Sequence, residues 1–360
     1  MNARGIHIPG LDGLRAVAVL AVVASHSWPQ MLIGGWAGVD IFFVLSGFLI
    51  TSIVLAEHER TGRISFQRFY MRRALRLLPA LAVTLLLGVL VAQLIYPKSA
   101  GDTVHEAFAA ALYVANWVVA FGQVHSGLLI HTWTLSIEEQ FYWTWPLALA
   151  VLLRVGGRRL ALRVTIAMIA IVVIHRLMGV QGAYFRTDTR ADSLLIGCAV
   201  AIAASMGAFE RLSRRAIGVA TLVGTLALGF VFAFGQQASP FMEGVGYTFV
   251  ALASATIVIA LAVRPLRPVT ATLGWRPLTW IGQRSYGVYL YHPLCLAVVA
   301  TRLGVVGPAT LVTTAALSVA TAAVSYRYLE TPFLRLKDRE KESTARQRGQ
   351  SKVRPAQTSR

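Results

Sequence analysis

Apolar stretches long enough to cross a membrane recur along the whole chain, separated by short polar segments. An α-helix of about 20 apolar residues spans the hydrocarbon core of a bilayer, so each stretch predicts a transmembrane helix. The predicted spans are residues 9–28, 37–55, 77–95, 139–153, 163–180, 190–207, 216–235, 243–263, 285–303 and 307–329. We therefore expect an all-α protein, a polytopic membrane helical bundle with ten crossings.

Arginine clusters follow the second, fourth, sixth and eighth predicted spans, and this alternation sets the orientation of the chain. The loop after the first span contains no Lys or Arg, and the loop after the third contains only Lys98. Because cytoplasmic loops carry the excess of basic residues, both termini are expected in the cytoplasm. The segment 104–121 is also apolar, but it holds His105, Glu106 and Asn116. An eleventh crossing there would place the later clusters outside, so we expect an interfacial or re-entrant helix.

The composition agrees with a membrane protein, because 56% of the 360 residues are hydrophobic and 14% are charged. The net charge of +18 lies in the short clusters and in the segment after Pro332, so we expect a lipid bilayer and no nucleic acid as partner. Residues 1–334 are expected to form one transmembrane domain and 335–360 a basic, disordered cytoplasmic tail. Cys198 and Cys295 lie inside predicted spans without metal-ligand spacing, so we expect packing roles and no metal.

Two ionisable side chains, Arg15 and His26, interrupt the first predicted span. They are eleven positions apart, which places them within about 20° of one helical face and roughly 16 Å apart along the axis. Ionisable groups inside a membrane are costly and indicate a functional site. Taken singly, each also has a simpler explanation, since His26 lies beside Trp28 near the interface and an arginine can snorkel to the headgroups.

Two adjacent carboxylates, Glu138 and Glu139, enter the fourth span from outside, at the membrane level expected for His26. A carboxylate that orients an imidazole is the usual support for a general base. Neighbouring residues on a helix point about 100° apart, so we expect one of the pair to face His26. Compensation of the helix dipole is the alternative role for these residues.

Basic residues at the predicted inner face could hold an anionic ligand. Arg73 and Arg76 are three apart on one helical face, where two guanidinium groups can clamp a phosphate, although positive-inside topology also explains them. The sequence contains no Gly-rich phosphate loop and no G-x-S-x-G elbow, which argues against a P-loop NTPase and an α/β-hydrolase. His292 is expected near mid-membrane, where a histidine often serves as a helix–helix hydrogen-bond partner.

Taken in order, these motifs resemble the acyltransferase-3 family of bacterial inner-membrane O-acyltransferases. The resemblance covers about residues 8–335, and its one departure is Trp133-Thr-Leu where the family usually has Trp-Ser-Leu, which keeps the hydroxyl. The matching strings are Gly10-Leu-Asp-Gly-Leu-Arg15, the R-x10-H pair Arg15 and His26, Gly38-Val-Asp-Ile-Phe-Phe43, Arg73-Ala-Leu-Arg76, Thr132-Trp-Thr-Leu-Ser-Ile-Glu-Glu-Gln-Phe-Tyr142, Arg190-Ala-Asp-Ser-Leu194, Ser285-Tyr-Gly-Val-Tyr-Leu-Tyr-His292 and Tyr328-Leu-Glu-Thr-Pro332.

The resemblance implies an O-acyltransferase of the bacterial inner membrane that moves an acyl group, expected to be acetyl, from cytoplasmic acyl-CoA to a hydroxyl of a surface or lipid-linked glycan. Some members carry an extracytoplasmic SGNH hydrolase-like domain, and this chain is similar to the stand-alone members. The expected catalytic groups are His26, Glu138 and Glu139, and the expected donor-binding residues are Arg15, Arg72, Arg73, Arg76 and Tyr286.

Two other functions stay open at this point. One is acylation of a small acceptor such as a macrolide, although an outward-facing His26 favours an extracytoplasmic or lipid-linked acceptor. The other is a transporter or flippase of lipid-linked glycans, which predicts inverted repeats and broken helices in matching halves that the sequence does not show. Within the transferase hypothesis, His26 acts either as a general base or as a covalent acyl carrier.

Overall fold

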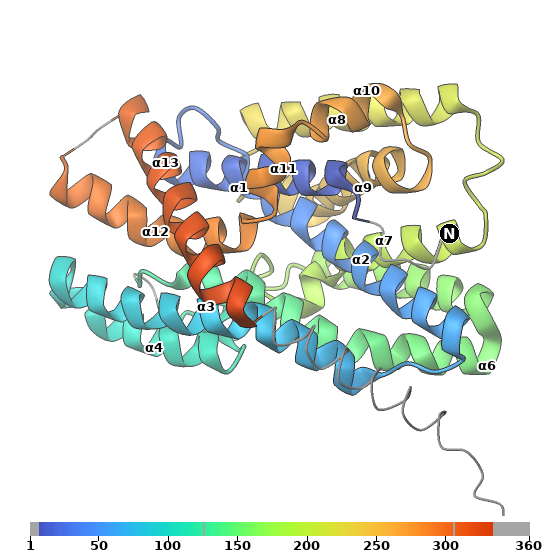
Figure 1. Cartoon of the computed structure of the whole chain (residues 1–360), viewed down its shortest axis with the longest axis horizontal. Coiled ribbons are helices and arrows are strands. Elements are labelled where there is room, and N and C mark those ends of the chain that lie inside the picture. The colour runs from blue at the N-terminus through green and yellow to red at the C-terminus, as the bar shows by residue number, and fades with distance from the viewer. Residues whose placement is uncertain (1–6, 125–126, 305–306, 334–360) are drawn as a thin grey trace, which may run out of the picture.

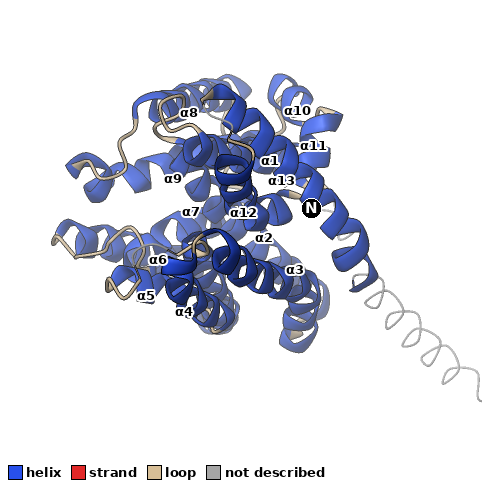
Figure 2. Ribbon diagram, turned by 90° about the vertical axis from the view of Figure 1, so that its left-hand side faces the viewer, coloured by secondary structure: helices blue, strands red, loops and turns tan. Residues whose placement is uncertain are grey.

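The computed structural model describes residues 7–124, 127–304 and 307–333. Within these ranges the secondary structure is helical and contains no strand, which confirms the all-α prediction (Figure 2). Figures 1 and 2 place α3 (Phe66–Ile95) and α6 (Trp133–Leu177) on one side of the bundle and α8 (Arg214–Phe234) on the other. The predicted cytoplasmic tail, 335–360, lies outside the described residues.

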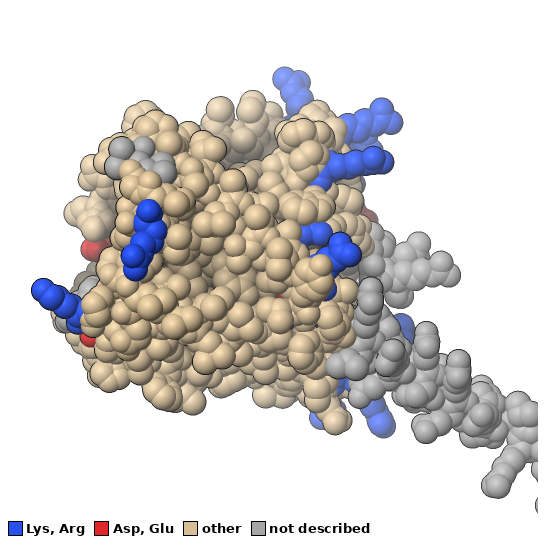
Figure 3. All heavy atoms as spheres, turned by 60° about the vertical axis from the view of Figure 1, so that its left-hand side comes forward, with Lys and Arg blue, Asp and Glu red and all other residues tan. Residues whose placement is uncertain are grey.

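Seven stretches of the described residues are long and apolar enough to cross a membrane. They contain the three helices just named together with α1 (Pro9–Ser27), α2 (Gly38–Thr61), α9 (Tyr247–Val258) and α13 (Pro308–Ser325). On the face that Figure 3 shows, Lys and Arg side chains lie toward the two ends of the bundle, more of them at one end, and leave its middle almost uncharged. This distribution suits a multi-pass membrane protein.

The helix α6 corresponds to two of the predicted spans. Its backbone leaves helical geometry at Gly156 and Gly157, and Gly157 has φ +65° and ψ −164°, a conformation that essentially only glycine adopts. The helices α7 (Thr187–Ser205) and α12 (Ser285–Arg302) coincide with the sixth and ninth predicted spans. Counting both arms of α6 with these two helices would give ten crossings, and that number stays a prediction.

The segment 104–121 folds as two short helices. They are α4 (Ala100–Ala111) and α5 (Ala115–Ala120), of 12 and 6 residues. At 1.5 Å per residue even α4 is only about 18 Å long, shorter than the hydrocarbon core of a bilayer. Tyr113, which lies between them, has φ +56° and redirects the chain. The segment therefore forms no single crossing helix, while its interfacial or re-entrant position stays a prediction.

Close backbone contacts fix α1 against two short helices, α10 (Arg267–Leu273) and α11 (Arg276–Gly282). A Cβ atom on Gly13 would lie 1.7 Å from the carbonyl oxygen of Leu273, and one on Gly282 would lie 1.7 Å from the carbonyl oxygen of Asp12. Glycine at both positions lets these backbones touch. The first turns of α1, which carry Arg15, are positioned by this contact.

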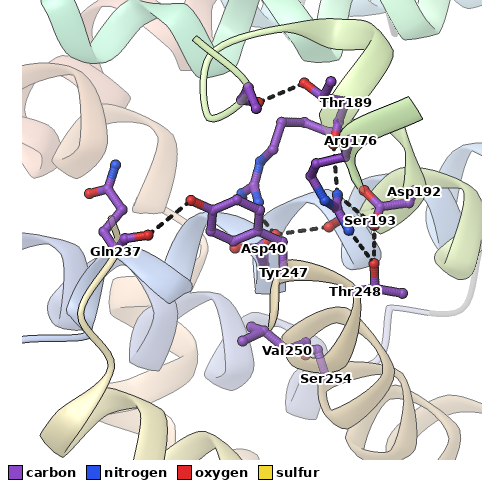
Figure 4. A network of polar contacts seen from close by, with 12 residues as sticks. Asp40, Arg176, Thr189, Asp192, Ser193, Gln237, Tyr247, Thr248, Val250 and Ser254 are labelled. Atoms are coloured by element: carbon purple, nitrogen blue, oxygen red, sulfur yellow. Dashed lines mark hydrogen bonds and ion pairs between the residues drawn. The ribbon is translucent and has the colours of Figure 1, made fainter. Parts of the chain in front are cut away.

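A buried ionic network joins α2, α6, α7 and α9 (Figure 4). Arg190 donates a hydrogen bond of 2.9 Å to Asp40, which also accepts one of 2.8 Å from the Ser193 hydroxyl. Arg176 donates to Asp192 at 3.0 Å. The side chains of both ion pairs are fully buried. Because removing one partner of such a pair leaves an uncompensated charge, at a cost of roughly 3–5 kcal/mol, the network holds these four helices in register.

Candidate active site

An open cavity with about 760 Å³ of empty space lies between α1, α2, α3, α6 and α12. Arg15 from α1 and Arg73 and Arg76 from α3 all line it, together with Tyr286 from α12. Two motifs that are far apart in the sequence, R-x10-H and R-x-x-R, thus contribute cations to one site. Arg72, on the same turn of α3, does not line this cavity, nor the cavities around Glu139 and His26.

The two carboxylates of α6 lie beside Arg73. Its Nε donates to Oε1 of Glu139 at 2.6 Å, and its Nη2 is 3.9 Å from Oε2 of Glu138. Ser46 donates to Glu138 at 2.7 Å, and the Arg73 guanidinium carbon lies 3.3 Å from the centre of the Tyr142 ring. Arg73 is therefore held in place by charge, hydrogen bonds and an aromatic face.

The expected pairing of Glu138 or Glu139 with His26 is wrong. That prediction placed the carboxylates at the membrane level of His26 and Arg73 at the inner face. In the structure α3 begins at Phe66 and carries Arg73 into the bundle, 2.6 Å from Glu139. A carboxylate surrounded by low dielectric gains more from a fixed cation than from a neutral imidazole. Glu138 lines the cavity of Arg15, and Glu139 lines a neighbouring cavity that Arg73 also lines, so both belong with Arg73 rather than with His26.

Arg15 and Arg76 keep donors available for an anion. Nη1 of Arg15 is 3.3 Å from Oδ1 of Asp12, the one ion pair of this guanidinium within the described ranges, and it leaves the other N–H groups free to face a ligand. Arg76 forms no ion pair with any described residue. Tyr286 is anchored, since its hydroxyl donates to the Leu77 carbonyl at 3.0 Å.

His26 lies in the last turn of α1 and lines a second cavity, with about 1110 Å³ of empty space. Its Nδ1 is 2.8 Å from the carbonyl oxygen of Val22, an acceptor, so the proton is on Nδ1. Nε2 then carries the free lone pair that a general base or nucleophile needs. The side chain is exposed to this cavity. We name it the outer cavity, and that of Arg15 the inner cavity, after the sides on which the predicted topology places these two residues. A single helix, α1, therefore presents Arg15 to the inner cavity and His26 to the outer one.

Two further histidines, His131 and His292, lie near His26 and were not among the residues predicted for the site. The ring centre of His292 is 5.1 Å from that of His26 and 5.4 Å from that of His131. His131 lines the outer cavity, and His292 is fully buried. Their separation along the chain hides this proximity, and each residue type alone carries too little information to reveal it.

The loop that lines the outer cavity near His131 is held by Glu106 of α4. The Leu129 amide donates to Oε2 of this carboxyl at 2.7 Å, and the Leu128 amide donates to Thr103 at 3.1 Å. Burial raises the pKa of Glu106 to about 7, and the amide hydrogen bond opposes that rise only in part. This carboxyl therefore changes its charge near neutral pH.

Comparisons with known proteins agree on one class. The model of a family described as "Acyltransferase domain" matches residues 8–329. The peptidoglycan O-acetyltransferase OatA of Listeria monocytogenes is 37% identical over 355 residues, which cover 91% of this chain and 56% of that protein. The O-acetyltransferase OatA of Staphylococcus aureus is 35% identical over 347 residues, covering 91% and 57%.

The putative peptidoglycan O-acetyltransferase YrhL of Bacillus subtilis is 37% identical over 309 residues, covering 79% of this chain and 48% of that protein. The chain thus spans about half the length of these curated relatives. No solved structure matches it.

Proposed function

The chain belongs to the acyltransferase-3 family, and from this premise we propose that it is a membrane O-acyltransferase that takes its acyl group from acyl-CoA and passes it to a hydroxyl of a glycan. The names of its relatives favour acetyl as the group and peptidoglycan as the acceptor. A glycan acceptor also fits the exposure of His26 to the outer cavity, which a small cytoplasmic acceptor would not need.

The observation that carries the donor half of this proposal is the convergence of Arg15, Arg73 and Arg76 on one cavity. Guanidinium groups bind phosphate oxygens through two parallel hydrogen bonds, and coenzyme A carries phosphates at the end of a long, thin arm. In our proposal Arg76 and Arg15 bind the phosphates and the arm. Glu138 and Glu139 act by holding Arg73, which is a positioning role.

The acceptor half depends on His26. Its Nε2 takes the proton of the acceptor hydroxyl while the hydroxyl oxygen attacks the thioester carbonyl carbon. A C–O bond forms, the C–S bond breaks, and its electron pair leaves on the sulfur, which takes up a proton to give the free thiol. An extended arm bridges the roughly 16 Å between Arg15 and His26 that helical geometry gives. A covalent variant, with the acyl group carried by the imidazole, uses the same residue.

A pair of arginines on α3 tests the donor site. Arg76→Ala removes a cavity cation, so we expect the KM for acyl-CoA to rise about tenfold or more, the value of one or two charge-assisted hydrogen bonds. Arg72→Ala is the matched control, with the same change of charge one turn away and outside the cavity, and its KM should stay within about twofold. Equal effects of the two variants on the KM would contradict this donor site.

A further inference from the structure

The three histidines near the outer cavity share one hydrogen-bonding pattern. Nδ1 of His26, Nε2 of His131 and Nδ1 of His292 each lie beside a backbone carbonyl oxygen, at 2.8, 3.2 and 2.6 Å. A carbonyl only accepts, so each of these nitrogens carries the proton. In every ring the other nitrogen is left with a free lone pair, and the cluster has three basic positions.

The free nitrogens of two of these rings, Nε2 of His292 and Nδ1 of His131, are buried, and no described residue provides a hydrogen-bond partner for either. Of the two, His292 is the one whose ring contacts that of His26. A buried polar atom without a partner costs roughly 1–3 kcal/mol, and such atoms in native proteins often have a functional reason. A phenylalanine would fill the same space without that cost. The lone pair therefore needs an explanation beyond packing.

His292 lies between the two cavities. Its ring contacts those of His26 at 5.1 Å and Tyr289 at 5.6 Å between ring centres. His26 lines the outer cavity and Tyr289 lines the inner one. Tyr289 is itself fixed, because its hydroxyl donates to the His131 carbonyl at 2.8 Å and accepts from the Thr134 hydroxyl at 2.8 Å. His292 is thus a buried base that lies between the cavity proposed for the donor and the cavity proposed for the acceptor.

We propose that His292 takes up the proton that His26 removes from the acceptor hydroxyl. This inference rests on the proposed function. It gives His292 the role beside His26 that the sequence had suggested for a carboxylate. The hydroxyl proton moves to Nε2 of His26 and then to the lone pair of His292. His292 then gives this proton up to the sulfur once the C–S bond has broken. Thioester and alcohol thus give ester and thiol, with no net gain or loss of a proton. His292 acts through His26 and is a positioning residue.

Chemical rescue tests this role. His292→Ala leaves a space of the size of the ring next to the open outer cavity, through which a small base can enter. We expect kcat to fall about 10- to 100-fold, the lower part of the range for proton-transfer groups, with the KM for acyl-CoA within about twofold of wild type. Added imidazole should raise the kcat of His292→Ala at least tenfold. Pyrazole has the same shape but is a much weaker base, so it should not raise this kcat.

Two further variants complete the design. His292→Gln keeps a hydrogen-bonding side chain of similar size but has no base, so its kcat should fall as well. This variant keeps the test valid if the protein around His292→Ala rearranges. His105→Ala, at an exposed position of α4, should leave kcat unchanged. Equal rescue by imidazole and pyrazole, or full kcat in His292→Gln, would overturn the role of His292 while the proposed function stands. A wild-type protein without acyl-CoA-dependent transfer would overturn both.

Discussion

Arg73 and Arg76 belong to one motif but differ in their partners and therefore in their roles. Arg73 already has a carboxylate at 2.6 Å and an aromatic ring below it, whereas Arg76 forms no ion pair with the described residues. A cation that is already neutralised adds little attraction for an anion, because its charge is compensated at close range. Arg76 and Arg15 are therefore the main anion-binding groups in our account, and Arg73 organises the wall of the cavity.

Glu106 gives a prediction of pH dependence. Its pKa is raised from 4.5 to about 7 in the folded protein. Between these values the unfolded chain has released the proton and the folded protein still holds it. The free energy of unfolding should therefore be highest below pH 4.5 and fall as the pH rises to about 7, by about 3 kcal/mol in total from this group.

The measurement is the thermal midpoint of purified protein in detergent at pH 5 and pH 7.5, for wild type and Glu106→Gln. The glutamine can still accept from Leu129 but does not titrate. The wild-type midpoint should drop more between the two pH values than that of the variant. An identical drop in both proteins would show that Glu106 is not protonated in the fold.

The site residues differ in how far the sequence could reveal them. The relation of Arg15 to His26 follows from their spacing, since both lie on one helix and the period of that helix is known. The partner of Glu138 and Glu139 could not be derived, because it depends on how far α3 extends beyond its apolar residues. His131 and His292 were beyond reach, since only tertiary packing brings them to His26.

At the scale of elements, the packing of α1 on α11 decides where Arg15 points. Gly282→Ala would place a methyl group 1.7 Å from the Asp12 carbonyl oxygen, so α1 must shift. Overpacking of this kind typically costs about 1–3 kcal/mol, and here it also moves Arg15 relative to Arg76. We expect a lower thermal midpoint together with a higher KM for acyl-CoA.

Gly218→Ala on α8 is the matched control. A Cβ there meets nothing within 4 Å, and alanine favours a helix over glycine by up to about 1 kcal/mol. Its thermal midpoint should stay equal or rise, and its KM should not change. If Gly282→Ala behaved like Gly218→Ala, the close contact would have no part in positioning the donor site.

The elements themselves were largely predictable, because apolar length is a direct consequence of membrane thickness. The break in α6 was anticipated only as a gap between two spans, and the glycine conformation at Gly157 gives its local cause. The division of 104–121 into α4 and α5 was not foreseen. It depends on the positive φ of Tyr113, which its residue type does not favour.

At the scale of the whole molecule, α1 contributes to two of the cavities among the described residues. The inner one gathers the cations of α1 and α3, and the outer one receives His26 and His131. The buried network around Arg190 and Asp40 ties together α2, α6, α7 and α9. This arrangement suits a reaction whose two substrates approach from opposite faces of a membrane.

The central claim is transfer across the membrane from a donor at Arg15 and Arg76 to an acceptor at His26. Wild type and His26→Ala would be reconstituted into liposomes, with acetyl-CoA outside and soluble peptidoglycan fragments either trapped in the lumen or added outside. Mass spectrometry of the fragments measures their acetylation. We predict acetylation of the trapped fragments by wild type only, and none when both substrates are outside. Acetylation with both substrates outside, or full transfer by His26→Ala, would contradict the account.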